Sequence, residues 1–198
     1  MPSEPLHPAF AAAVADMCAA PAPGDLLRRL LAAHPGMPRL LRLAETIPAG
    51  PPAWHSGSTL AHMARVMNAV AGDPLAVWMA FAHDLGKLTT PRDLWPHHYG
   101  HELRGVVLAR LYGQRAGLPP EEIEAGCFCA CQHMRAARLM QMKPRKRRAL
   151  ALLVEDMGLT RPFWSVVDAD AKTPVSRSAR EELLAALEVR AQKPPPGA

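Results

Sequence analysis

The sequence predicts an all-α protein, and three features of its 198 residues indicate this class. Apolar residues make up 49% of the chain, mainly Ala and Leu, whereas aromatic residues make up only 5%. Ala and Leu favour helices, while aromatic and β-branched side chains favour strands. The 21 prolines fall mostly between apolar-periodic segments or at the two ends, where they punctuate helices rather than break them.

The first fifty residues are expected to form a short helical lead-in. Apolar residues recur at helical spacing in three segments, which are 8–19, 25–34 and 37–46. We expect Gly24-Asp25 to cap the second of these helices. The Pro- and Gly-rich stretch 47–57 is expected to be a loop. The predicted organisation of the chain is a helical lead-in over 1–50, a main domain over 51–192 and a disordered tail over 193–198.

Seven stronger helices are expected after this loop. They span 58–71, 74–85, 102–116, 119–133, 144–157, 161–169 and 178–192. Asp73 and Pro74 resemble an N-cap followed by a proline at the first helical position. The segment 74–85 is apolar on nearly all sides, which predicts a buried helix. We expect Gly86 to end this helix in a left-handed cap.

The chain is basic, with a net charge of +5 and a pI of about 9.3. Much of the excess comes from a short run of five cations, Lys143, Arg145, Lys146, Arg147 and Arg148. A basic balance suits an anionic partner such as a phosphate ester or RNA, although it also serves ordinary solubility. The run is therefore a candidate phosphate-binding segment, and a solvated helix start is the alternative.

The expected compartment is the cytoplasm. No stretch approaches about 18 consecutive apolar residues, which excludes a membrane span, and no basic flank precedes the apolar residues 10–14, which argues against a signal peptide. The four cysteines are Cys18, Cys127, Cys129 and Cys131. Their spacing fits neither a zinc knuckle nor a redox pair, so we expect small, reduced side chains in or near the core.

Polar residues that can bind a metal fall at the end of the most apolar helix. His83 and Asp84 follow an otherwise apolar segment, and burying them without partners would be costly. A divalent metal ion would offset this cost, because it binds both imidazole and carboxylate. Neighbouring helical residues point about 100° apart, so the pair can grip one ion from two sides. His62, on the preceding helix, and Asp170 strengthen this interpretation.

At these residues the sequence resembles the HD-domain metal-dependent phosphohydrolases, whose pattern is His … His-Asp … Asp on separate helices. It is most similar to the HD domain at the C-terminal end of bacterial CCA-adding tRNA nucleotidyltransferases. The motifs that carry the similarity are Trp54-His55, His83-Asp84-Leu85-Gly86-Lys87, Thr89-Thr90-Pro91, Leu94-Trp95-Pro96, His98 and Gly100-His101-Glu102. The first fifty residues hold only four scattered acids, so we expect no nucleotidyltransferase head and no CCA addition.

The resemblance implies a set of metal ligands. Its core members are His62, His83, Asp84 and Asp170, and its extra histidines are His101 and His133. Six ligands suffice for two ions roughly 3.5–4 Å apart, with Asp84 as the bridge. Mixed imidazole and carboxylate ligands suit Mn, Fe, Co, Ni or Zn. Asp84 and Lys87 are then the expected catalytic residues, with the lysine neutralising charge on the phosphoryl group.

The resemblance also implies a substrate class, namely nucleotide-like esters such as 2′,3′-cyclic phosphodiesters, phosphomonoesters or an RNA end. The candidate substrate-binding residues are Lys87, His97, His98, Arg145 and Lys146. Two alternatives stay open, a non-catalytic module that binds RNA or a nucleotide and an HD-type di-iron oxygenase. The apolar face over 178–190 could pair with a second copy, which makes a homodimer possible.

Overall fold

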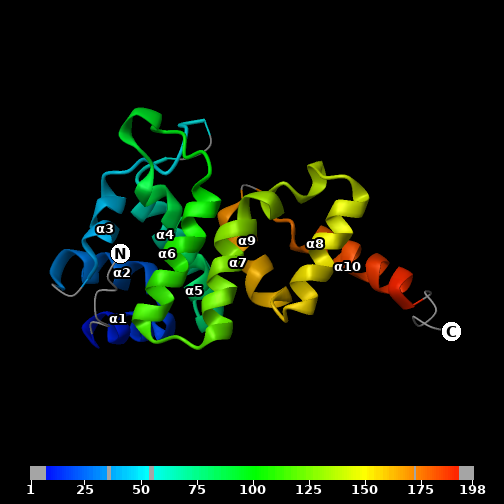
Figure 1. The fold of residues 1–198 in the computed structure, drawn as a ribbon, viewed down its shortest axis with the longest axis horizontal. Coiled ribbons are helices and arrows are strands. Elements are labelled where there is room, and N and C mark those ends of the chain that lie inside the picture. Colours follow the sequence, from blue (N-terminus) through cyan, green and yellow to red (C-terminus); the bar gives the residue numbers. More distant parts are fainter. Residues whose placement is uncertain (1–7, 35–36, 54–55, 172, 192–198) are drawn as a thin grey trace. The chain divides into compact units, whose positions relative to one another are not determined.

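The computed structural model describes residues 8–34, 37–53, 56–171 and 173–191, and the following statements concern these residues. They form ten α-helices joined by four short 3-10 helices, with no strand and a single isolated bridge between Pro48 and Ser58 (Figure 1). The all-α prediction is confirmed. The disordered tail predicted over 193–198 and the Trp54-His55 motif lie outside the described residues.

The chain divides into two compact units, residues 1–132 and 133–198. The helices of the first unit are α1 (Pro8–Ala19), α2 (Pro23–Ala33), α3 (Arg39–Arg42), η1 (Leu43–Glu45), α4 (Thr59–Ala69), α5 (Pro74–Ala82), η2 (Leu85–Thr89), η3 (Arg92–Leu94), α6 (His101–Ala116) and the first part of α7 (Pro120–Ala137). Those of the second unit are the end of α7, η4 (Leu139–Gln141), α8 (Pro144–Asp156), α9 (Thr160–Asp170) and α10 (Ser176–Ala191). The predicted division at residue 50 stays a prediction.

Two capped helices carry the centre of the first unit. The Ser58 hydroxyl accepts a hydrogen bond from the Ala61 amide at 3.1 Å and starts α4. The Asp73 carboxylate accepts one from the Ala76 amide at 3.2 Å, and Pro74 opens α5 as predicted. Every residue from position 76 to position 82 is buried, so α5 is the buried helix that its sequence predicts.

Gly86 does not cap α5, which corrects the prediction. The helix ends at Ala82, and Gly86 lies in η2 with no left-handed backbone angle. A Cβ atom added at Gly86 would lie 1.9 Å from the carbonyl oxygen of His101 and 2.6 Å from the amide nitrogen of Gly105. Glycine is therefore required here because η2 and α6 approach each other backbone to backbone.

Gly24 is not a cap either. It lies inside α2, which begins at Pro23 and has no side-chain N-cap. A Cβ atom added at Gly24 would lie 2.1 Å from the carbonyl oxygen of Ala64, and the Gly24 amide donates to the Asn68 side chain at 2.7 Å. The glycine thus serves the close approach of α2 to α4. The helix predicted over 37–46 is also shorter, since it divides into α3 and η1.

The four cysteines are unbonded, and each is buried or half-buried, in agreement with the prediction. Burial, together with the nearby Glu122 carboxylate, raises the pKa of the Cys18 thiol to about 12. Burial also raises the pKa of Cys127. Neither thiol forms the reactive thiolate readily, so both act as small core residues. Within the described residues, none of the helices combines the length and the apolar content that a membrane span requires.

The second unit is held together by α8, which packs along α10, and by α9, which contacts both. Arg147 of α8 donates to the Glu182 carboxylate of α10 at 2.6 Å. The Asp168 carboxylate accepts from the amides of Val175 and Ser176 at 2.6 and 3.0 Å, so it caps α10. This role accounts for an acidic residue two positions before the predicted ligand Asp170.

Candidate metal centre

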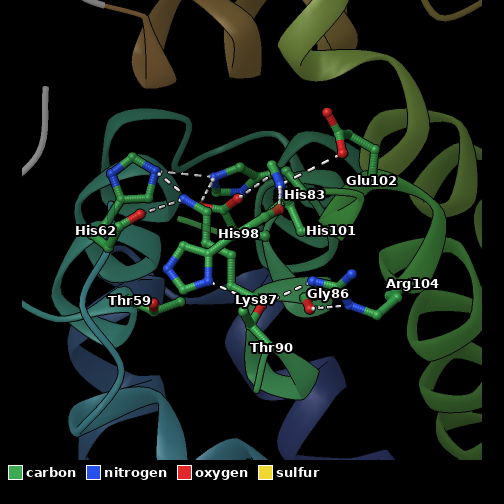
Figure 2. Close-up of polar contacts among 12 residues, drawn as sticks. Thr59, His62, His83, Gly86, Lys87, Thr90, His98, His101, Glu102 and Arg104 are labelled. Atoms are coloured by element: carbon green, nitrogen blue, oxygen red, sulfur yellow. Dashed lines mark hydrogen bonds and ion pairs between the residues drawn. The ribbon is translucent and has the colours of Figure 1, made fainter. Parts of the chain in front are cut away.

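Four of the predicted ligands meet inside the first unit. His62 lies on α4, His83 directly follows α5, Asp84 precedes η2 and His101 opens α6. Their side chains are buried, with whole-residue exposures of 5%, 0%, 1% and 5%, respectively. Figure 2 shows the labelled His62, His83 and His101 side chains close together, near the end of the Lys87 side chain. Residues from three helical segments thus converge in one small volume.

The Asp84 carboxylate is the hub of this cluster. One of its oxygens, Oδ2, lies 3.2 Å from Nε2 of His62 and 3.3 Å from Nε2 of His83. The other, Oδ1, lies 3.5 Å from Nε2 of His101. The two Nε2 atoms of His62 and His83 are 3.2 Å apart. All three imidazoles therefore turn the same ring nitrogen toward one carboxylate.

The Asp84 carboxyl is ionised despite its burial. Desolvation alone would raise its pKa, but the neighbouring Lys87 ammonium and the hydrogen bond from His62 hold the pKa well below its usual value. The Lys87 ammonium lies 2.6 Å from Oδ2. A carboxylate in this state is a ready ligand for a cation.

The backbone orients two of the imidazoles. Nδ1 of His83 lies 2.5 Å from the carbonyl oxygen of Ala80, and Nδ1 of His101 lies 2.8 Å from that of His98. A carbonyl oxygen only accepts, so Nδ1 carries a proton in both rings, and in a neutral ring Nε2 then keeps its lone pair. Histidines that bind metal ions are held in this way. The donor chemistry and orientation of this cluster therefore fit a divalent transition-metal ion.

Comparison with known proteins agrees with this geometry. Residues 55–159, more than half of the chain, match the family described as the HD domain. This chain belongs to the HD-domain family. It is 33% identical to a Multifunctional CCA protein of Alkalilimnicola ehrlichii over 148 residues, which are 70% of this chain and 34% of that protein.

Further relatives carry the same name. A Multifunctional CCA protein of Alcanivorax borkumensis is 29% identical over 164 residues, which are 79% of this chain and 40% of that protein. One from Xanthomonas campestris is 35% identical over 91 residues, 46% of this chain and 22% of the protein. The HD-domain chain therefore spans well under half the length of these relatives. It has no significant match among solved structures.

The buried side chains of Lys87 and His98 both donate hydrogen bonds to the backbone of residues 48 and 49. The Lys87 ammonium donates to the Ala49 carbonyl at 2.7 Å, and Nε2 of His98 donates to the Pro48 carbonyl at 2.8 Å. Nδ1 of His98 then accepts from the Thr90 hydroxyl at 3.0 Å. Burial lowers the pKa of the His98 imidazole, which favours this neutral form. The structure gives both residues protein partners, and their predicted contacts with substrate stay predictions.

The remaining predicted residues lie apart from this cluster or in the second unit. His97 is exposed and stacks on Tyr99, with ring centroids 5.5 Å apart. Arg145 and Lys146 are exposed in the first turn of α8. In the second unit, His133 is the first residue and lies on α7, and Asp170 is the last residue of α9. The assignment of His133 and Asp170 as ligands stays a prediction.

Arg104 is a structural residue that sequence reasoning missed. Its guanidinium donates to the Thr90 hydroxyl at 2.9 Å (Figure 2). It also donates to the Tyr99 carbonyl at 2.7 Å and to the Thr89 hydroxyl at 3.2 Å. It thereby ties η2 to the loop that leads into α6, which carries His101. An arginine in an amphipathic helix gives no signal of such a role, because cations are common on exposed helix faces.

Proposed function

We propose that this HD domain hydrolyses nucleotide-like phosphate esters with the help of one or two divalent transition-metal ions. HD domains form a superfamily of metal-dependent phosphohydrolases, so the finer proposal concerns the substrate. The observation that carries it is the buried Asp84 carboxylate, ionised and faced by Nε2 atoms of three histidines at 3.2–3.5 Å. Manganese, iron, cobalt, nickel and zinc suit this donor set.

We further propose that His133 and Asp170 complete the ligand set. Both have side chains of the chemical kind that binds divalent ions, and both match the ligand pattern of the HD-domain resemblance. Asp84 would offer two carboxylate oxygens to the bound metal. A bound ion would lower the pKa of a coordinated water and polarise a phosphoryl oxygen.

The residues of the chain have separate tasks in this proposal. Asp84 supplies negative charge at the centre, and the Lys87 ammonium keeps that carboxylate ionised and in place. Burial of the cluster excludes bulk water, which strengthens every electrostatic interaction within it. A phosphate ester is a substrate that such a centre could hydrolyse with water as the only other reactant.

The first test is hydrolysis of 2′,3′-cyclic AMP by chelator-stripped protein with and without added Mn, Co or Ni. Turnover that returns with the metal is expected, and no turnover with any of these metals contradicts the proposal for this substrate class. Asp84→Asn and His83→Ala should each lower turnover by at least about 100-fold and reduce bound metal, with helicity by circular dichroism retained.

Asp168→Asn is the matched control, because this carboxylate caps α10 and is not a proposed ligand. It should keep its metal content and turnover. Equal losses in Asp84→Asn and Asp168→Asn would show general damage to the protein rather than loss of a metal ligand.

A binding module for RNA is a second candidate, favoured by the exposed cations of α8. Arg145 and Lys146 are exposed at the start of this helix, next to the exposed Lys143. Positive side chains at a helix N-terminus are mildly unfavourable, which suggests a use for them. RNA binding that persists in His83→Ala and Asp84→Ala, without turnover by the unmodified protein, would favour this function.

A further inference from the structure

The imidazole of His62 is held differently from those of its two neighbours. Its Nδ1 atom lies 3.0 Å from the Nη2 atom of Arg65, one turn further along α4. An arginine guanidinium has only donor groups and stays protonated in proteins. Nδ1 of His62 must therefore accept this hydrogen bond, so in a neutral ring the proton sits on Nε2.

The rest of the cluster is consistent with this assignment. His83 donates from Nδ1 to the Ala80 carbonyl, which leaves a lone pair on its Nε2. Nε2–H of His62 faces that lone pair at 3.2 Å and the Asp84 carboxylate at 3.2 Å. Each hydrogen bond in the series from Arg65 through His62 to His83 then has one donor and one acceptor.

The tautomer decides whether a histidine can bind a metal through a given nitrogen. His83 and His101 present lone pairs at Nε2, whereas His62 presents a proton there. Ligation by Nε2 of His62 requires that proton to move to Nδ1, where it would oppose the Arg65 guanidinium. No proton leaves the ring in this exchange, but the hydrogen bond between Arg65 and His62 is lost.

We propose that Arg65 is a positioning residue that holds His62 in the tautomer unable to bind metal through Nε2, so that His62 joins the centre only when Arg65 withdraws. The proposal rests on the proposed role of His62 as a metal ligand. Arg65 is exposed, so its guanidinium can leave toward solvent. His83, Asp84 and His101 then form a set of metal ligands that is ready to bind, and Arg65 controls how readily His62 joins them as the fourth ligand.

Nitrogen NMR of metal-free protein labelled at histidine tests the tautomers directly, without any need for activity. Long-range proton–nitrogen correlations above the histidine pKa should show Nε2–H for His62 and Nδ1–H for His83 and His101. Single His→Gln variants assign the signals. Arg65→Met should shift His62 toward Nδ1–H. A wild-type His62 with Nδ1–H, or a pattern that Arg65→Met leaves unchanged, would overturn the proposal.

Calorimetric titration of the same chelator-stripped proteins with cobalt gives the second readout. Arg65→Met should bind cobalt about tenfold more tightly, because ligation no longer breaks a hydrogen bond to a charged group. Arg110→Met is the matched control, since Arg110 is an exposed arginine paired with Glu124, and it should bind like the wild type.

Arg65→Lys separates the tautomer from the charge. If this variant shows Nδ1–H at His62 yet binds cobalt with wild-type affinity, charge alone controls binding and the proposal is wrong. The predicted tautomers without cobalt binding by any variant would instead defeat the proposed metal-dependent function, while confirming the hydrogen bond from Arg65 to His62.

Discussion

The two units of the chain place their polar residues in opposite ways. Of the nine buried polar or charged residues in the described part of the chain, eight lie in the first unit and only His133 lies in the second. In the second unit, ion pairs such as that between Arg190 and Asp156 lie in contact with solvent. Buried polar groups cost free energy unless they have partners, and the proposed metal centre would account for those of the first unit.

Charge follows the same division. Residues 133–198 hold thirteen of the 23 basic residues and seven of the 18 acidic ones, which gives them a net charge of +6 and leaves the first unit at −1. The whole positive excess of the protein therefore belongs to the unit with few buried polar groups. Under the proposed function, the first unit would perform the chemistry and the second would attract the anionic substrate.

Glycine substitutions should give the largest difference between the units. Gly86→Ala places a Cβ atom against backbone of α6, so the free energy of unfolding should fall by about 3 kcal/mol or more. Gly158→Ala meets no atom within 4 Å and only strains a left-handed backbone with φ of 68°, at a cost of about 1 kcal/mol. Urea unfolding measures both, and equal losses would break the comparison.

Cation substitutions should give a smaller difference of the same kind. Lys87→Met leaves the buried Asp84 carboxylate without its ammonium partner, so stability should fall by about 3 kcal/mol at most. Hydrogen exchange at the Ala49 amide should also become faster, because the Ala49 carbonyl loses its contact. Arg147→Met breaks a half-buried pair with Glu182 and should lower the unfolding free energy by about 1 kcal/mol or less.

The smallest effects are expected from the exposed cations of α8. Arg145→Gln and Lys146→Gln should each weaken binding of a single-stranded RNA oligonucleotide by a few-fold. They should also reduce the slope of log affinity against log salt by about one each. Fluorescence anisotropy across a KCl series measures this, and metal content should not change. Affinity that is independent of salt would contradict a role of this surface in phosphate binding.

Helix positions and caps could be read from the sequence because they depend on local signals. Asp73 and Pro74 predict the start of α5, and apolar residues on all sides of this helix predict its burial. His83 and Asp84 could be singled out because such residue types are costly to bury without partners. His62 strengthens that interpretation, and only the resemblance to HD domains adds His101. The structure brings these four together, and the ligand roles of His133 and Asp170 stay predictions.

Long-range requirements could not be read in this way. Gly24 and Gly86 look like helix caps in the sequence, but each is glycine because another helix approaches it closely. The partners of Arg65 and Arg104 are likewise set by side-chain geometry, and an arginine gives the same pattern whether it faces water or an imidazole. Local sequence reports what a residue is able to do, while packing decides which option it uses.

The contact between α2 and α4 bears on how this domain could be moved into another protein. Gly24 touches the backbone of α4 at Ala64, two positions after His62, and its amide bonds to Asn68. A graft that began at residue 51 would lack α2, so α4, which carries His62, would lose this packing contact. The smallest transplantable piece that keeps the imidazole in register therefore starts no later than Pro23, and any engineered fusion should place its junction before that residue.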